Sequence, residues 1–210
     1  MELFSETNLV RLCGSPEGPP RYSHSSRGQD FYLLPLRVRR LSGVEDRLNL
    51  TLRRELLPAV EAGGGKLAVT GELRSFNNHR GNGPKLVLTV FVRELEVWDG
   101  EDQNLVRLQG ALCRPPKLRC TPLGREIADL MLAVNRRCGR SDYLPCICWG
   151  LEARKAARWP VGTAVRLEGR FQSRPYLKLL EDGSERRVAY EVSAAEVEAV
   201  ALPERAETER

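Results

Sequence analysis

The chain contains one sequence pattern twice, and this internal repeat constrains its fold more than any other feature. Residues 8–12 read Asn-Leu-Val-Arg-Leu, and the same five residues recur in the same order at 104–108. Further identities follow at the same offset: Gly14 and Gly110, Gly28 and Gly124, Leu36 and Leu132, Val38 and Val134, Arg40 and Arg136, Gly43 and Gly139, Asp46 and Asp142. After a two-residue insertion, the glycine and serine that bound residues 71–75 recur in residues 169–173. The chain is therefore one module written twice.

Each copy has the length of a small domain that can bury a modest core. We expect a first domain at residues 1–98, a short acidic linker at 99–103, a second domain at 104–202 and a frayed tail at 203–210. Both copies are basic: residues 7–93 hold 14 Lys and Arg against 7 Asp and Glu, and residues 103–190 hold 17 against 8. Basic modules favour a polyanionic partner such as nucleic acid, although solvated surfaces of unrelated proteins also reach this excess.

Several other classes of protein are disfavoured. No apolar run approaches the length of a membrane span, and the N-terminus is too acidic for a signal peptide. The six cysteines form no Cys-x-x-Cys pair, so neither a disulfide scaffold nor a zinc site is indicated, and reduced thiols in a cytoplasmic protein fit better. His24 and His79 are expected in polar loops without metal-ligating partners, and residues 63–66 lack the rest of a phosphate-binding loop. We expect no catalytic residues, no metal and no cofactor.

Strand patterns dominate both copies. In the second copy the expected elements are strands at 105–110, 127–136 and 143–149, a helix at 151–159, and a closing hairpin at 163–180 and 188–200, with a loop at 114–124. The first copy reads similarly, with a closing hairpin at 66–76 and 85–97 and a weaker helix, in which Pro58 must either lie in the first turn or break the helix. Five strands with a helix between the third and fourth is the order of the OB-fold. The sequence thus predicts an all-β protein of two tandem five-stranded OB-fold barrels.

The expected strand 143–149 carries two large aromatic residues on one face. Because side chains alternate along a strand, Tyr143 and Trp149 point away from the small apolar set of Leu144, Cys146 and Cys148, which suits a barrel interior. Stacked nucleobases would explain such outward rings, at roughly 1–3 kcal/mol per stack. Tyr176, in the fourth strand, adds a third ring among cations. Alternatively, these rings pack under a loop or at a subunit interface.

Four segments of the second copy resemble bacterial single-stranded DNA-binding proteins in order and spacing. They are GALCRPPKLRCTPLG at 110–124, LAVNRR at 132–137, DYLPCICWG at 142–150 and LEGRFQSRPY at 167–176. The resemblance covers nearly all of residues 104–200. It implies sequence-independent binding and protection of single-stranded DNA in replication, recombination and repair, with base stacking on Tyr143, Trp149 and Tyr176. The cations expected to contact phosphates are Arg119, Arg136, Arg137, Arg170, Arg174, Lys178 and Arg186 in the second copy, and Arg53, Arg74 and Arg80 in the first.

The first copy resembles the family more distantly, over residues 8–97. It carries Arg47, Arg53 and Asn78 where the second copy has Tyr143, Trp149 and Tyr176. Phe76 is expected to compensate in part. Family members usually end in a flexible linker and an acidic tip that recruits replication and repair proteins. Residues 203–210 lack an aspartate run and an aromatic end, so recruitment by that route is not expected.

Members of the resembled family usually assemble four OB-folds, so two copies of this chain would form a homodimer, unless the two modules pair within one chain. Two alternative functions stay open. One is a replication-restart or conjugation accessory with the same barrel and a preference for structured junctions. The other is a protein-interaction scaffold that has lost nucleic-acid binding, against which the aromatics and basic surface of the second copy argue.

Overall fold

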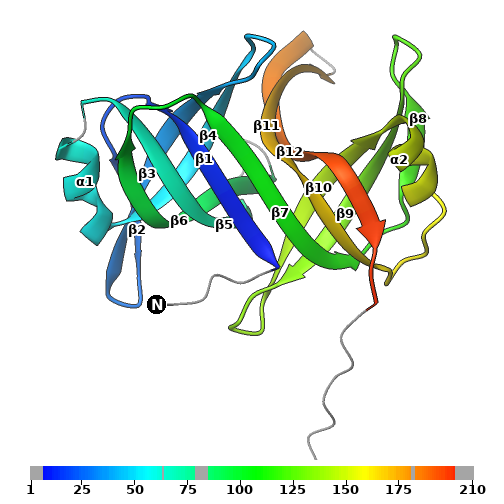
Figure 1. The fold of residues 1–210 in the computed structure, drawn as a ribbon, viewed down its shortest axis with the longest axis horizontal. Coiled ribbons are helices and arrows are strands. Elements are labelled where there is room, and N and C mark those ends of the chain that lie inside the picture. The colour runs from blue at the N-terminus through cyan, green and yellow to red at the C-terminus, as the bar shows by residue number, and fades with distance from the viewer. Residues whose placement is uncertain (1–6, 63, 79–84, 181–182, 202–210) are drawn as a thin grey trace, which may run out of the picture.

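The computed structural model describes residues 7–62, 64–78, 85–180 and 183–201, and it forms two barrels side by side (Figure 1). The first comprises β1 (Asn8–Pro16), β2 (Arg21–Ser26), β3 (Gln29–Arg39), β4 (Glu45–Arg53), a 3₁₀ turn (Arg54–Leu56), α1 (Leu57–Ala62), β5 (Lys66–Asn77) and β6 (Leu86–Trp98). The second comprises β7 (Gln103–Leu112), β8 (Lys117–Cys120), β9 (Glu126–Asn135), β10 (Ser141–Trp149), α2 (Gly150–Ala156), β11 (Ala164–Leu180) and β12 (Gly183–Ala199). The expected frayed tail lies outside the described residues.

The order of the strands in the first half is the mirror image of their order in the second half. The strands form one sheet in the order β2-β3-β4-β6-β5-β1-β7-β11-β12-β10-β9-β8, and the pairings β1–β3 and β7–β9 close the two barrels. Each helix follows the fourth strand of its half and leads into the closing hairpin, so α1 and α2 lie at opposite ends of the molecule (Figure 1). The prediction of an all-β, tandem OB-fold protein is confirmed.

Some local expectations are wrong. The segment at 114–124, expected as a loop, contains β8, which pairs with β9 from Lys117 opposite Asp129 to Cys120 opposite Glu126. Its equivalent β2 gives the first half a sixth strand as well. The Pro and Gly residues that suggested a loop only flank β8, and Gly124 takes a positive φ in the turn to β9.

The second helix ends at Ala156, before the expected position 159. Arg158 and Trp159 donate backbone hydrogen bonds to carbonyls three residues earlier, a tighter turn that closes the helix ahead of Pro160. In the first copy Pro58 lies in the first turn of α1 and does not break the helix. No helix among the described residues is long and apolar enough to cross a membrane.

Aliphatic side chains fill both barrels and form one continuous core. Phe171 is its largest fully buried side chain, and Leu73 holds the equivalent position in the first half. Cys146 and Cys148 of β10 point inward and are fully buried, as the alternation predicted. Burial raises the pKa of the Cys148 thiol to about 11 and that of Cys146 further. All six cysteines, each within the described residues, are free thiols.

The two barrels meet through β1 and β7, the strands that carry the repeated residues 8–12 and 104–108. The strands pair antiparallel with Val10 opposite Val106, which is its own counterpart in the other copy. A residue that faces its counterpart marks a two-fold axis, so the junction has the self-complementary geometry of a two-fold dimer interface within one chain.

Asn8 and Asn104 extend the sheet at this junction. The side chain of Asn8 donates to the carbonyl of Leu73 and accepts from its N–H, both at 2.9 Å. Asn104 makes the same pair of hydrogen bonds with Phe171, at 2.6 and 2.9 Å. Each amide thus substitutes for a peptide unit between β1 and β5, and between β7 and β11.

Two buried carboxylates hold the barrels together from opposite sides. Asp46 in the first half accepts a hydrogen bond from the backbone N–H of Ser173 at 2.7 Å. Asp142 in the second half accepts one from the N–H of Ser75 at 2.6 Å. Both aspartates are fully buried. The four residues are among the identities between the copies, so their repetition reflects the symmetry of the junction.

Candidate nucleic-acid interface

The outer face of β10, β11 and β12 carries the three aromatic residues singled out in the second copy. Tyr143 and Trp149 on β10 are 51% and 40% exposed, and Tyr176 on β11 is 38% exposed. We call this surface the second-module face. On the same face between them, Pro145 is partly buried and Ile147 is buried at 5%, so an apolar floor separates the two exposed rings of β10.

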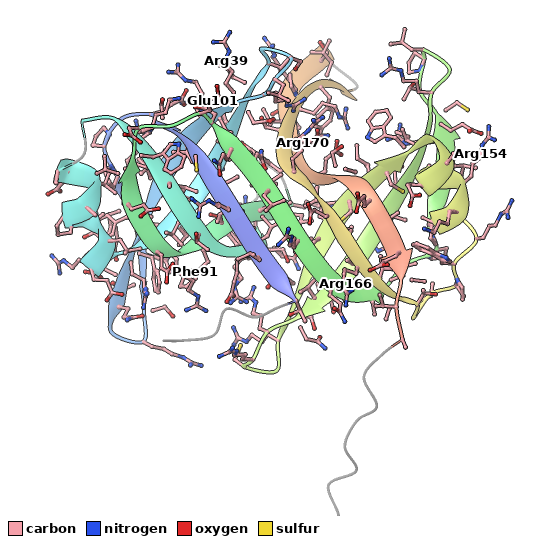
Figure 2. All side chains as sticks on the ribbon, viewed as in Figure 1. Arg39, Phe91, Glu101, Arg154, Arg166 and Arg170 are labelled. Atoms are coloured by element: carbon pink, nitrogen blue, oxygen red, sulfur yellow. The ribbon has the colours of Figure 1, made fainter. Side chains whose placement is uncertain are left out.

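Trp149 lies at the end of β10, where the chain enters α2. Its indole Nε1 donates to the hydroxyl of Ser193 on β12 at 3.2 Å, which fixes the ring over the sheet. Ser193 in turn lies opposite Arg170 of β11, labelled in Figure 2. Trp149 and Arg170 therefore belong to one continuous surface.

The same alternation puts Arg174 and Tyr176 on the face that holds Arg170. Arg174 lies 3.5 Å from the carboxylate of Glu191 on β12. Tyr176 faces Arg187 across the β11–β12 ladder, whereas Arg186 faces Leu177 and so lies on the other side of the hairpin. Arg187 is the cation beside Tyr176, and its hydrogen bond to Glu185 raises the pKa of its guanidinium.

Arg119 on β8 widens this surface. It donates two hydrogen bonds to the carboxylate of Asp129, at 2.6 and 3.0 Å, and both side chains are exposed. The hydrogen bonds raise the pKa of the Arg119 guanidinium, which keeps it charged. Arg137 is exposed in the turn between β9 and β10. The side chain of Lys178 on β11 lies outside the described part of the structure.

Arg136 and Arg74 lie at the junction between the barrels instead of on the open face. Arg136 donates to the buried carboxylate of Asp142 at 2.7 Å, and this hydrogen bond raises the pKa of its guanidinium. Arg74 contacts the same carboxylate at 3.2 Å. Both guanidiniums neutralise the buried charge of Asp142. A phosphate that contacted them would therefore have to share them with this carboxylate.

Tyr143 also reaches the junction, because its backbone N–H donates to the hydroxyl of Ser75 at 2.8 Å. Phe76, the next residue of β5, is 52% exposed. Arg53 ends β4, partly exposed, with its guanidinium 3.0 Å from Glu55. Arg80 lies outside the described residues.

The first module carries an aromatic cluster that sequence reasoning missed. His24 stacks on Phe31, with ring centroids 5.0 Å apart and an interplanar angle of 21°, and Phe31 lies 6.0 Å from Phe91. The placement of His24 in a loop is wrong: it lies on β2, where a bulge after Tyr22 brings it opposite Phe31 of β3. The signal available was weak, because β2 has no apolar alternation.

Chemically, the second-module face offers flat rings among guanidiniums on a rigid sheet. Among the described residues no cluster of His, Cys, Asp and Glu could hold a metal ion. The second-module face suits a ligand that combines planar rings with repeated negative charge. The fold and this face together define a tandem OB-fold protein with an exposed aromatic and cationic sheet surface.

Comparison with known proteins shows which OB-fold proteins the chain resembles. Residues 103–200, which make up most of the second module, match the model of the "Single-strand binding protein family". A single-stranded DNA-binding protein of Halalkalibacterium halodurans is 36% identical over 80 residues, which cover 35% of this chain and 48% of the relative. Single-stranded DNA-binding protein 2 of Listeria innocua is 36% identical over 92 residues, covering 40% of this chain and 55% of the relative. The chain thus spans about half the length of these relatives.

A crystal structure of the wild-type single-stranded DNA binding protein from Thermus aquaticus has a similar fold over both barrels. It superposes with a TM-score of 0.70 at 24% identity, covering 95% of this chain and 96% of that one. At this identity the likeness establishes the fold alone.

Proposed function

We propose that the protein binds single-stranded DNA without sequence preference and protects it during replication, recombination and repair. The observation that carries the proposal is the second-module face, where Tyr143, Trp149 and Tyr176 are exposed on strands that also present Arg170 and Arg174. The family match of residues 103–200 covers this face. Aromatic platforms in a basic groove bind single strands because every nucleobase has a face to stack.

Duplex DNA should bind poorly to this surface. Its bases already stack on one another and cannot reach Trp149, whereas an unpaired strand exposes them. The hydrogen bond from the indole to Ser193 holds the ring in place before binding, which reduces the entropy lost when a base stacks on it.

We infer that residues 104–202 carry most of the affinity and that residues 1–98, joined by 99–103, contribute phosphate contacts through arginines such as Arg53 and Arg80. The asymmetry of the rings at equivalent positions supports this division, because both halves have a similar basic excess. The test is to compare Trp149→Ala with Arg53→Ala. The first should reduce affinity at every salt concentration, and the second should chiefly reduce the dependence on salt. Equal losses of the same kind would contradict the division.

We also propose a homodimer that presents four barrels, in a non-enzymatic, nucleoid-associated protein. The two-fold junction already joins two barrels inside one chain, and closed two-fold symmetry is the commonest arrangement of soluble homo-oligomers. Light scattering at micromolar concentration should give the mass of two chains. A monomer that retains DNA binding would refute the dimer and leave the binding proposal intact.

A further inference from the structure

We propose that the first module has its own base-stacking platform, built from His24 on β2, Phe31 on β3 and Phe91 on β6, and not from β4, the counterpart of the strand that carries Trp149 in the second module. This inference rests on the proposed function, because it assigns a second contact site for the same single-stranded ligand. It makes the first module a stacking module as well as a source of phosphate contacts.

The register of the strands shows where the rings of the two modules differ. Trp149 on β10 lies opposite Ile127 on β9, and the equivalent pair in the first module is Arg53 opposite Phe31. In the second module the aromatic residue of this pair lies on β10 and its partner on β9 is aliphatic. In the first module the aromatic residue lies on β3 and its partner on β4 is basic. The sheet at this point keeps one aromatic residue in each module.

The second ring of the platform, Phe91, lies on β6, which is adjacent to β4. In the second module Ser193 lies opposite Arg170, and in the first module Phe91 holds the equivalent place opposite Glu72. The hydroxyl that anchors Trp149 is therefore replaced by a phenyl ring. Phe91, labelled in Figure 2, lies 6.0 Å from Phe31 at an interplanar angle of 47°.

The third ring comes from β2. His24 is exposed and lies nearly parallel to Phe31, at 21° and 5.0 Å, with its Nδ1 3.0 Å from the hydroxyl of Ser23. Phe31 and Phe91 are half-buried, so the sheet holds the inner rings of the stack in place. A nucleobase laid on His24 would continue a stack that Phe31 has already begun.

Guanidiniums surround the platform. Arg93 and Arg74 lie over the Phe91 ring, at 4.9 and 5.9 Å from its centroid. Arg54 is the most exposed cation here, with 74% of its side chain accessible, and it lies 3.3 Å from Asp30. Exposed ion pairs of this kind add little to the stability of a protein. Arg54 can therefore exchange Asp30 for a phosphate at little cost.

A packed surface cluster that merely stabilises the β2–β3 hairpin would show the same rings, so the test must separate binding from folding. The full-length protein carrying His24→Ala and Phe31→Leu keeps an apolar side chain at position 31 and loses both flat rings. Tyr22→Leu is the matched control: Tyr22 is an exposed aromatic on the same strand that packs edge-on against Tyr32, outside the platform. Thermal unfolding of each variant reports on the hairpin.

Binding is measured with two lengths of oligo(dT). An OB-fold covers about 4–16 nucleotides, so a strand of about 10 occupies one module and a strand of about 30 reaches both. The double variant should bind the long strand at least about fivefold more weakly than wild type, the loss expected for one base stack. It should bind the short strand, held by the second module, as wild type does, and Tyr22→Leu should change neither.

Unchanged binding of the long strand by a folded double variant would overturn the inference. As a second measurement on the wild-type protein, an oligonucleotide containing 5-iodouracil should cross-link on irradiation to peptides that contain His24 or Phe31. Adducts at Trp149 with none in these peptides would also overturn it. If wild type binds neither oligonucleotide, the proposed function itself fails. If Trp149→Ala leaves binding of the short strand unaffected, the stacking role of the second-module face fails.

Discussion

The backbone N–H of Ser75 donates a 2.6 Å hydrogen bond to the carboxylate of Asp142, so a residue of the first barrel stabilises a charge buried in the second. Arg136 and Arg74 complete the shell around this carboxylate. Asp46 and Ser173 repeat the contact on the other side of the junction, at 2.7 Å.

Asp142→Asn should therefore destabilise the whole molecule. Removing one charge from a buried pair typically costs about 3–5 kcal/mol, because the partner charges stay buried. Urea unfolding measures the loss. The control is Asp129→Asn, which breaks the exposed pair with Arg119 and should cost at most about 1 kcal/mol. Equal effects of the two substitutions would mean that the junction does not depend on Asp142.

Trp149→Ala should weaken binding of oligo(dT) by about 1–3 kcal/mol, the free energy of one base–aromatic stack. Trp159→Phe is a suitable control because Trp159 packs against the core beside Lys155, away from the second-module face. Fluorescence anisotropy of a labelled oligonucleotide gives both affinities. A wild-type affinity in the Trp149 variant would remove the main support for stacking.

Arg170 and Arg174 should act through the salt dependence of binding. Each phosphate contact to a single strand contributes roughly −0.7 to the slope of log affinity against log salt concentration. Replacing both arginines by alanine should flatten the slope by about twice that amount. Arg166→Ala offers a matched control, since Arg166 lies near the start of the same strand in an exposed pair with Glu198.

Much of this arrangement follows from local patterns. The period of two along residues 143–149 correctly placed Cys146 and Cys148 inside and Tyr143 and Trp149 outside, because a half-buried strand leaves few alternatives. The repeat itself showed Asp46 and Asp142 to be equivalent. Their role was invisible, since each contacts a serine of the other module that lies far away in the sequence.

Pairing register accounts for most of what the sequence could not show. Whether Arg186 or Arg187 accompanies Tyr176 depends on where the β11–β12 hairpin turns, and a shift of one residue exchanges the two faces. The strand β2 was missed because its exposed, polar residues carry no alternation. The polar pattern therefore predicted a loop at His24, and no sequence feature indicated its stack on Phe31.

The buried thiols predict a loss of stability at alkaline pH. Burial raises the pKa of Cys148 from 9.0 to about 11, so the folded protein holds this proton more tightly than the unfolded chain does. The resulting stabilisation is complete below pH 9.0 and is lost as the pH rises through about 11. Urea unfolding at neutral pH and near pH 11 should show a smaller decline for Cys148→Ala than for wild type. The exposed Cys120→Ala should decline as wild type does.

Binding of unpaired bases by the second-module face can be tested most directly through the intrinsic tryptophan fluorescence of the full-length protein. The protein is titrated with oligo(dT) and with duplex DNA at the same salt concentration. Stacking of a base on Trp149 should quench the emission strongly with the single strand, and Trp149→Phe should abolish most of that change. The duplex should produce little quenching and should not displace the single strand. Equal responses to single-stranded and duplex DNA would contradict the claim that the second-module face binds unpaired bases.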